Sequence, residues 1–406
     1  MARRSSRNRG GDSGYALSRR GFLATGSAGF AGTYMFGFRP IDAVAEGMPA
    51  GAPSTPQTLV IGWASGPNGV DLEFNASLRS LGVYRNCGAT ALRFNAEPVG
   101  DAFQDDFADL IPAEAKEWQL NDDWSSITIT LNEGVLGPTG NELTTDDVIY
   151  RYERNWALRG TGWGFIKDAM LLAEDSVVAQ DRYTYTINMT GPNALAESIQ
   201  AHIGAVLWDS IEAKKHATSD DPWSTKWQSS NFAGHGPWQL SEYVAGESWT
   251  FDRNPSFYRP ERYTGNVTKV INRVIPSSAN RMALLQSGAI DMAFDLQASE
   301  LVRLQSSPGV RVDSLIGNHL QWLGFSFNTE AGEPLRDLNV RKAIGHALPF
   351  EQLLERPYLG LARQMTSTVA PAYVGYDEVS KIWDRQYDLA KAKKLMAQSA
   401  YPDGTT

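Results

Sequence analysis

The residues of this chain that could do chemistry are widely scattered. Its five histidines are His202, His216, His235, His319 and His346. No H-E-x-x-H pair is present to hold a zinc ion on one helix face, and neither a G-x-S-x-G elbow nor a P-loop occurs. Cys87 is the only cysteine, which excludes an internal disulfide and a multi-cysteine metal site. We therefore expect no catalytic residue, no metal, no cofactor, and a buried free thiol at Cys87.

Two short patterns are compatible with chemistry but do not require it. Residues 160–164, GTGWG, carry glycines at alternate positions, as some phosphate-binding loops do. They follow a predicted helix rather than a strand, which disfavours a phosphate site. Asp291 and Asp295 could pair for acid–base work or metal binding, provided that the strand predicted there continues through Leu296.

Tryptophan is abundant, and all twelve tryptophans follow residue 45. Trp63 and Ser65 lie at the exit of the first predicted strand, and Trp322 lies just before the segment LGFSFN. Loops at strand ends form the clefts between α/β lobes, so these three residues are candidates for ligand contact, with burial in a core as the alternative. Other tryptophans lie within or beside strand patterns and are assigned to packing: Trp118, Trp124 and Trp249.

The first 45 residues have the features of an export signal. Arg19 and Arg20 stand in the stretch SRRGFLATG, a weakly apolar, glycine-rich stretch follows to Phe38, and residues 43–45 form an A-x-A cleavage pattern. This arrangement resembles a twin-arginine signal, which implies the twin-arginine translocase as a partner during export. A transmembrane anchor is the alternative, although the glycines leave only a marginal span. Residues 46–57 are expected to be a flexible leader.

The charge of the chain argues against nucleic acid as a partner. The net charge is −9, and without residues 1–45, which hold seven Arg and two Asp, it is −14. An acidic surface repels phosphate backbones, and no Lys/Arg block with interleaved aromatic residues is present.

Periodicity predicts a mixed α/β chain. Strands are predicted at 58–63, 125–135, 182–189, 267–276 and 289–294, with a hairpin over 234–262 that turns at Ala245-Gly246. Helices are predicted at 143–156, at 277–288, at 339–360 in two parts separated at Leu348-Pro349, and after Asp388, where the helix ends before a turn at residues 402–404. Thr144 and Asp147 have capping-box spacing, and Asp388 is a predicted N-cap.

Two further segments are expected to extend this pattern. Residues 299–312 repeat the helix-then-strand rhythm with a cap at Ser299. Residues 323–328 alternate Leu323, Phe325 and Phe327, as a strand does.

Five stretches in fixed order together resemble the extracytoplasmic solute-binding proteins of peptide-type ABC importers, the oligopeptide- and dipeptide-binding proteins of family 5. They are residues 110–155, ending in the helix opened by Thr/Asp/Asp; 234–261, the Gly-rich hairpin with Arg-Asn-Pro; 273–294, with Leu-x-Ser-Gly-x-Ile-Asp; 323–348, with Phe-Asn-Thr and Val-Arg-x-Ala; and 387–404. The likeness covers most of Thr58 to Gly404.

The resemblance implies an α/β, periplasmic-binding-protein-like fold of two hinge-connected lobes with an extra domain. It divides the chain into domain I (58–88 and 230–312), domain II (89–229) and domain III (313–406). Family members continue past Gly404, so we expect the C-terminal part to be missing, with domain III incomplete and domain I lacking its returning segment.

The resemblance also implies a function. The protein is expected to capture a solute, a peptide or peptide-like compound, in the periplasm or at the outer face of the cytoplasmic membrane. It then delivers the solute to ABC importer permease subunits by cleft closure, without acting as an enzyme. Ligand contact is implied for Trp163, Phe294, Asp295 and Asn328, the acidic strand end at Asp295 having a structural or ligand-polar role.

Two departures from the family and one rival remain. LGPTGNEL replaces the family's usual turn before Thr144, and Pro349 stands where an Asp usually caps the helix. The rival is an enzyme exported by the twin-arginine route with a bound cofactor. The ligand itself stays open among peptides, metal complexes, sugars and opine-like compounds.

Overall fold

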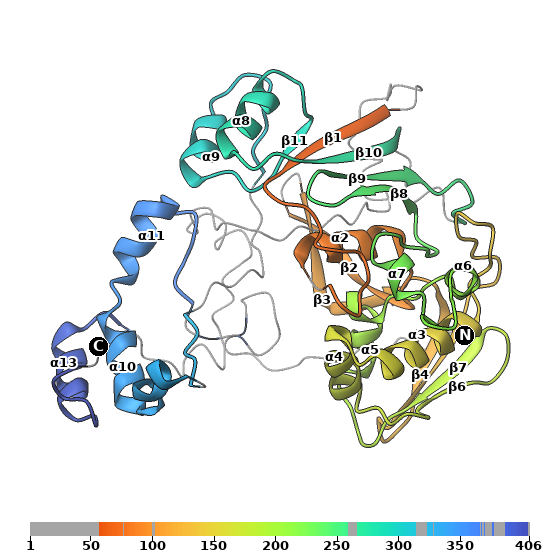
Figure 1. Cartoon of the computed structure of the whole chain (residues 1–406), viewed down its shortest axis with the longest axis horizontal. Helices are drawn as coiled ribbons and strands as arrows, with labels where there is room; N and C mark the ends of the chain where they lie inside the picture. Colours follow the sequence, from red (N-terminus) through yellow and green to blue (C-terminus); the bar gives the residue numbers. More distant parts are fainter. Residues whose placement is uncertain are drawn as a thin grey trace, which may run out of the picture.

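The computed structural model describes residues 57–404 except 76, 100–101, 259–265, 314–322, 328, 366, 368, 370–375 and 377–385. The predicted signal with Arg19 and Arg20, most of the leader, and the candidates Trp322 and Asn328 therefore lie outside the described residues. Figure 1 shows two sheet-containing bodies that lie against each other and a group of C-terminal helices beside them.

In the first sheet, the first strand of the described chain pairs with strands from much later in the sequence. Its strand order is β11-β1-β10-β9-β8. The strands are β1 (Gln57–Trp63), β8 (Trp238–Val244), β9 (Ser248–Arg253), β10 (Val267–Val274) and β11 (Met292–Ala293). β1 pairs in parallel with β10 and β11, whereas β10, β9 and β8 are antiparallel. The β8–β9 turn contains Gly246 at φ 77°, a left-handed conformation that favours glycine, which confirms the predicted hairpin.

Two helices flank the parallel edge of this sheet. α8 (Ser278–Gln286) begins at the N-cap Ser277, and Gly288 at φ 72° follows its end. α9 (Ala298–Leu304) has Gln297 as its N-cap, so the predicted cap at Ser299 is wrong. Residues 310–313 form no strand, so the predicted helix-then-strand repeat stops after the helix.

The second sheet has the order β4-β5-β7-β6 and lies in the body built from the middle of the sequence. Its strands are β4 (Ala115–Leu120), β5 (Ser126–Leu131), β6 (Val177–Ala179) and β7 (Thr184–Asn188). Ile127, Ile129 and Leu131 alternate with partly exposed threonines, so one face of β5 enters the core, as predicted. A separate antiparallel ribbon is formed by β2 (Leu92–Val99) and β3 (Ala102–Pro112).

Helix α3 (Thr145–Leu158) runs between the two bodies. Its first turn carries the predicted capping box, in which the Thr144 N–H donates to Asp147 Oδ2 at 2.8 Å and the Thr144 side chain accepts in return. The neighbouring short elements are α2 (Leu78–Cys87), α4 (Thr161–Met170), α5 (Ala196–Gln200), η2 (Ile203–Ala205), α6 (Ser210–Lys215) and α7 (Thr225–Gln228).

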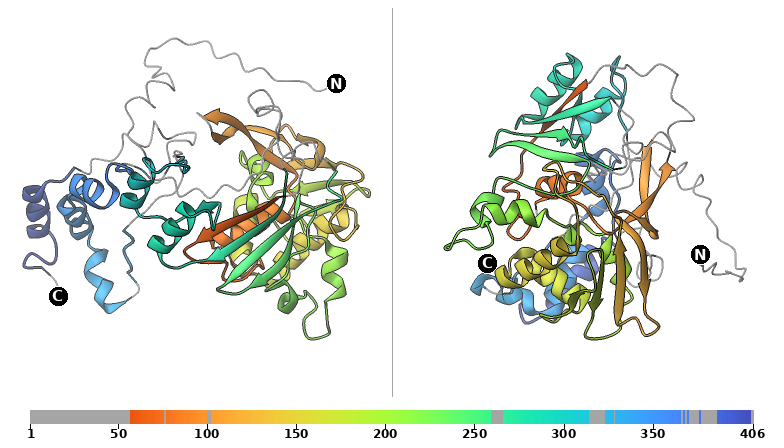
Figure 2. Two further views of the ribbon diagram at one scale, coloured as in Figure 1. Left: turned by 90° about the horizontal axis from the view of Figure 1, so that it is seen from above. Right: turned by 90° about the vertical axis from the view of Figure 1, so that its right-hand side faces the viewer.

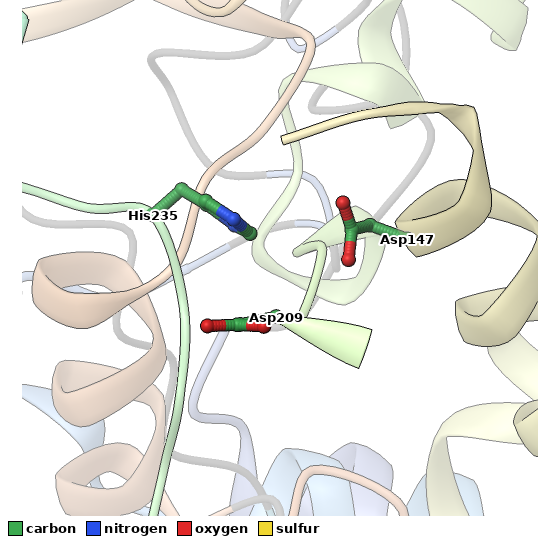
Figure 3. Close-up of side chains that lie close together, drawn as sticks. All are labelled: Asp147, Asp209 and His235. Atoms are coloured by element: carbon green, nitrogen blue, oxygen red, sulfur yellow. The ribbon is translucent and has the colours of Figure 1, made fainter. Parts of the chain in front are cut away.

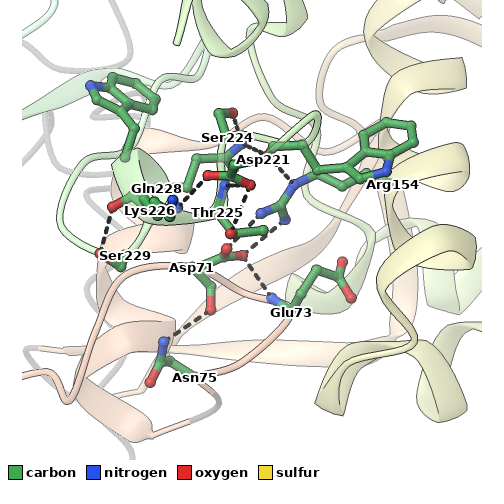
Figure 4. Close-up of polar contacts among 12 residues, drawn as sticks. Asp71, Glu73, Asn75, Arg154, Asp221, Ser224, Thr225, Lys226, Gln228 and Ser229 are labelled. Atoms are coloured by element: carbon green, nitrogen blue, oxygen red, sulfur yellow. Dashed lines mark hydrogen bonds and ion pairs between the residues drawn. The ribbon is translucent and has the colours of Figure 1, made fainter. Parts of the chain in front are cut away.

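A buried ion-pair network fastens α3 to the loop that follows β1; we call Asp71, Glu73, Arg151, Arg154 and Asn155 the arginine network. Arg154 donates to both carboxylate oxygens of Asp71 at 2.9 and 2.5 Å. Arg151 donates to Glu73 at 2.7 Å, and Asn155 donates to the other Glu73 oxygen at 2.9 Å. Figure 4 shows Arg154 pointing at Asp71, with the α7 residues around Asp221 alongside. The two bodies are therefore joined by charges that are fully removed from water.

Gly160 has a packing role at this joint. It is the N-cap of α4, and a Cβ at this position would lie 2.0 Å from the carbonyl oxygen of Glu73. The chain therefore needs glycine here so that α4 can approach the loop after β1. Trp163 lies in the first turn of α4 rather than in a loop.

The C-terminal helices are η4 (Glu330–Arg336), α10 (Leu338–Ala347), α11 (Phe350–Tyr358) and α13 (Leu389–Ala397). α10 packs against α13, and both views of Figure 2 show these helices as one group. Asp337 caps α10 and also accepts the Ala400 N–H at 2.8 Å, while His346 Nδ1 donates to the Gln386 carbonyl at 2.8 Å. α11 contacts α9, which connects the group to the first sheet.

Several details of this region bear on the predictions. The two helices separated at Leu348-Pro349 and the Asp388 cap are confirmed, and Pro349 itself is the N-cap of α11. The strand predicted over LGFSFN is wrong, because residues 323–327 pair with no described strand and Leu323 is 61% exposed.

The predictions for three single side chains have different outcomes. Trp249 is buried as predicted, but Trp124 is 46% exposed at φ 61° in a turn, so the packing role predicted for Trp124 is wrong. Cys87 is a buried free thiol, as predicted. Among the described residues, no helix is both long and apolar enough to span a bilayer.

Candidate functional site

The carboxyl ends of β1 and β11 meet at one edge of the first sheet because the two strands are parallel. Trp63 closes β1 there, and its ring stacks on Phe294 with centroids 4.2 Å apart and planes 7° apart. The Arg79 guanidinium from α2 lies 4.4 Å from the centre of the Trp63 ring. The indole N–H donates to Asn272 Oδ1 at 2.9 Å, and the side chain is 2% exposed. Trp63 is therefore a fixed platform on which other side chains are ordered.

Asp295 lies directly after this platform and has an unusual backbone. Its φ is 59°, in the left-handed region that aspartate tolerates better than most residues. One carboxylate oxygen accepts from Arg79 at 2.5 Å and from the Ala64 N–H at 3.1 Å. The turn is held by Arg281, which donates to the carbonyls of Phe294 and Asp295 at 2.9 and 2.6 Å. Such over-determined strain is typical of functional sites.

The electrostatics of the pair follow from its partial burial. Burial lowers the pKa of Arg79 to about 10, and burial raises the pKa of the Asp295 carboxyl above its ordinary value. Their ion pair opposes both shifts, and the two side chains keep 10% and 19% of their surface exposed. A polar ligand can therefore reach a preorganised charge pair beside an aromatic platform.

A shallow pocket adjoins the platform on the α2 side. Its lining includes Trp63, Arg79, Asn86 and Trp249. Ser65, two residues beyond Trp63, is exposed. The structure thus brings together three of the predicted ligand-contact residues, Trp63, Phe294 and Asp295, and adds Arg79, which the sequence did not single out. Ser65 follows Ala64, whose N–H donates to Asp295.

Other predicted residues lie elsewhere. Trp163 packs edge-on against Trp156 with centroids 5.9 Å apart, and its indole N–H has no hydrogen-bond partner among the described residues. Asp291 accepts the Val60 N–H at 2.7 Å and does not pair with Asp295, because the strand ends at Ala293. The strand does not continue through Leu296, so Asp291 and Asp295 do not meet the condition for an acid–base pair.

A second group of titratable residues was not predicted; we call Asp147, Asp209 and His235 the acid–histidine cluster. One possible ligand atom from each lies within 4.8 Å of the others, and all three residues are buried. Figure 3 shows the His235 ring directed toward Asp147, with Asp209 on the remaining side. Burial lowers the pKa of His235, which favours the neutral imidazole. The sequence gives no spacing signal, because the three residues come from three distant segments.

Comparison with known proteins identifies the family. Residues 109–406 match the family described as bacterial extracellular solute-binding proteins, family 5 Middle. The chain belongs to this family. Membership confirms the predicted resemblance and the predicted location outside the cytoplasm.

Curated relatives of this family 5 chain are distant in sequence. Heme-binding protein A of Haemophilus influenzae is 26% identical in an alignment of 330 positions that covers 74% of this chain and 56% of that protein. Di/tripeptide-binding protein 3 of Pseudomonas aeruginosa is 24% identical in an alignment of 318 positions that covers 73% of this chain and 56% of that protein. A putative ABC transporter peptide-binding protein of Brucella ovis is 27% identical over 93% of this chain and 65% of its own length. The chain thus spans about half to two thirds of these relatives.

Solved structures of family 5 type share the fold. The periplasmic binding protein DppA of Helicobacter pylori, in complex with the peptide STSA, superposes with a TM-score of 0.72 at 23% identity, covering 86% of this chain and 67% of that one. MoaA of A. tumefaciens R10, in complex with mannopinic acid, gives a TM-score of 0.68 at 21% identity over 86% of this chain and 66% of that one. These likenesses confirm the predicted fold class.

Proposed function

We propose that this chain captures a peptide or peptide-like solute outside the cytoplasm and presents it to the permease subunits of an ABC importer. The observation that carries the proposal is the family match over residues 109–406, together with relatives named as peptide-binding proteins. The strand order of the first sheet supports this proposal, because ligands bind at the carboxyl ends of parallel strands in α/β sheets.

The physical basis of capture is a difference between an open and a closed state. A cleft between hinged bodies satisfies the polar groups of a ligand from both sides, so the closed form gains contacts that the open form lacks. In this reading the solute is held without bond-making, and the chain is not an enzyme. The domain boundaries given above, with the hinge between domains I and III, belong to this proposal.

The residues assigned to ligand contact divide into two kinds. Ser65 and the Arg79–Asp295 pair supply polar groups at the sheet edge, and Trp63 and Phe294 supply the platform behind them. Burial leaves Trp63 little surface of its own, so we assign it the role of holding Phe294 and Arg79. Trp163, Trp322 and Asn328 complete the proposed set.

Binding is tested by following thermal unfolding and tryptophan fluorescence against di- to pentapeptides, heme, an opine and a sugar. We expect saturable binding of a peptide at about micromolar affinity, which corresponds to about −8 kcal/mol. Heme belongs in the series because one relative is named for it. The absence of any ligand-induced change across the series would contradict the proposal.

A steric block tests the position of the site. Ser65→Arg places a long side chain at the exposed residue that follows Ala64, whose N–H donates to Asp295, and is expected to weaken peptide binding at least about tenfold without lowering the melting temperature. Ser219→Arg, at another exposed serine, is the matched control and should bind as the unsubstituted chain does. Equal affinities for the two variants would place the ligand elsewhere.

We also propose export by the twin-arginine translocase. The double change Arg19→Lys, Arg20→Lys conserves charge but removes the arginine pair, and we expect the protein to stay in the cytoplasm. The matched change Arg3→Lys, Arg4→Lys should leave export intact. Cell fractionation and immunoblotting measure both, and export of the first variant would remove this route from the proposal.

A further inference from the structure

The acid–histidine cluster has a charge imbalance that the rest of the described chain does not correct. Asp147, Asp209 and His235 are 2%, 0% and 0% exposed. The ion pairs of the described residues involve other acidic groups, and no lysine or arginine among them pairs with Asp147 or Asp209. Two carboxylates are therefore buried beside one imidazole, and a buried charge is either paired, bound to a metal or removed by a proton.

The imidazole supplies the second observation. Neither Nδ1 nor Nε2 of His235 has a hydrogen-bond partner among the described residues, although the ring is completely buried. Buried polar side chains in proteins are almost always hydrogen-bonded, so an unpartnered one calls for a bound water, a bound ion or another role. A proton on the ring would add a second buried N–H without a partner, whereas a metal ion would use the nitrogen lone pair directly.

The carboxylates are oriented as metal ligands need to be. Asp209 caps α6 and accepts from Thr139 Oγ1 at 2.6 Å and from Asn141 Nδ2 at 3.0 Å. Asp147 accepts the N–H groups of Thr144 and Ser210 at 2.8 and 2.7 Å. These hydrogen bonds fix the orientation of both carboxylates, as outer-shell hydrogen bonds do in metal sites.

The histidine is fixed by its backbone. A Cβ on Gly234 would lie 2.5 Å from the Cys87 carbonyl oxygen, and one on Gly236 would lie 2.6 Å from the Gly88 carbonyl oxygen. The Gly236 N–H donates to the Cys87 carbonyl at 2.9 Å. Because both neighbours of His235 are glycines, the segment before β8 can pack closely against the end of α2. The His235 side chain then points toward the two carboxylates (Figure 3).

We propose that Asp147, Asp209 and His235 bind one divalent transition-metal ion, Zn²⁺, which ties the segment before β8 to the N-terminal ends of α3 and α6. One imidazole nitrogen and two carboxylate oxygens, with a water as fourth ligand, match the donor types and number that Zn²⁺ takes. Ligands about 2.1 Å from one tetrahedral ion lie about 3.4 Å from one another, so donors that are up to 4.8 Å apart draw together by as much as about 1.4 Å on binding.

The first measurement uses the full chain, freed of metal by chelator and dialysis. Isothermal titration and elemental analysis after desalting should find one Zn²⁺ per chain. Saturating Zn²⁺, at about a hundredfold excess over Kd, should raise the melting temperature by about 5 °C or more. Ca²⁺ at the same concentration should do neither, because it prefers more oxygen ligands. Absence of stoichiometric zinc would overturn the proposal.

Variants then locate the ion. His235→Asn should weaken zinc binding at least about a hundredfold, since removal of outer-shell partners alone costs 10–100-fold. His216→Asn, at a histidine on the surface of α6, should bind zinc normally. Retention of zinc by a folded His235→Asn protein would overturn the assignment.

If His235→Asn does not fold, the zinc ligands can still be identified by spectroscopy on the unsubstituted protein. Zinc X-ray absorption should show one imidazole nitrogen and otherwise oxygen in the first shell. A shell with sulfur, or with more than one imidazole, would contradict the proposed ligands.

Discussion

Helix α3 carries two buried groups of charged side chains, and they are balanced in different ways. The arginine network, at the carboxyl half of α3, places two guanidinium groups against two carboxylates. The acid–histidine cluster, at the amino end of the same helix, places two carboxylates beside one imidazole. The charges of the first joint are balanced within the chain, whereas those of the second are balanced, in our proposal, by a bound cation.

The two groups also differ in what surrounds their carboxylates. Asp71 is held by a two-pronged arginine contact, which matches the planar geometry of both groups. Asp147 and Asp209 are held by backbone N–H, hydroxyl and amide donors. Neutral donors orient a carboxylate but leave its charge in place, and this is the charge that the proposed zinc ion would compensate.

The largest expected effect comes from breaking the arginine network. Arg154→Met leaves Asp71 buried without its partner and should lower the free energy of unfolding by about 3–5 kcal/mol. Urea denaturation followed by circular dichroism measures this. Arg182→Met, which removes an exposed ion pair with Glu142, should change stability little. Similar losses from both would show that the network is not internally balanced as described.

The same network can be tested by removing both charges. In Asp71→Asn combined with Arg154→Met, no uncompensated carboxylate remains, so the double variant should be more stable than Arg154→Met alone. A double variant with the summed loss of the two single changes would argue that hydrogen-bond geometry, not charge balance, controls this joint.

The second effect is the response to zinc. At about a hundredfold excess over Kd, zinc should add about 2.7 kcal/mol to the free energy of unfolding. Arg154→Met should keep this gain, because the two joints use different residues, and His235→Asn should lose it. Urea denaturation with and without zinc measures both. Loss of the gain in Arg154→Met would mean that the two joints are coupled.

A smaller effect is expected from the donors behind the cluster. Thr139→Val removes the hydroxyl that donates to Asp209 at 2.6 Å. It should cost about 1.5–3 kcal/mol of stability and weaken zinc binding about 10–100-fold. Thr139→Ser keeps the hydroxyl and is the matched control. Equal zinc affinity for the two variants would show that this donor does not orient a ligand.

The smallest effect involves Asp221, another buried carboxylate that is held by neutral donors. Burial opposes ionisation of Asp221, but the N–H groups of Lys226 and Thr225, each at 2.8 Å, hold its pKa below the ordinary 3.8. Its contribution to stability is therefore present above about pH 3.8 and lost as the pH falls through the lower folded-state value.

The measurement for Asp221 compares two variants over pH. Asp221→Asn should be less stable than the unsubstituted chain at pH 7, and the difference should shrink at pH 3. Asp220→Asn, at the exposed neighbouring residue, should show no such convergence. A difference for Asp221→Asn that is independent of pH would contradict this account.

The fold was predictable where one local rule governs a segment. Alternation fixed the buried face of β5, and the Thr144–Asp147 capping box placed the start of α3. Local rules failed at Ser299 and at residues 323–327. Gln297, not Ser299, is the N-cap of α9, because Gln297 forms a capping box with Glu300 and the helix therefore begins earlier. Alternation at Leu323 and Phe327 does not make a strand here, because no strand of the described residues pairs with this segment.

The site was predictable only in part. Trp63 and Ser65 followed from their position at a strand end, and the fold puts Phe294 and Asp295 beside them. Arg79 carries no sequence signal, since its role depends on α2 packing against an edge made of residues more than 200 positions away. Asp147 was recognised as a cap, which concealed its second contact with the His235 region. Only three-dimensional proximity joins such residues.

The parallel pairing of β1 has a consequence for how the chain is made. Its neighbours β10 and β11 leave the ribosome roughly 200 residues later, whereas β4 to β7 pair with strands close in sequence. Contacts between distant segments form slowly. The middle body can thus form during synthesis while the first strand still has an unpaired edge, a state that is prone to aggregation.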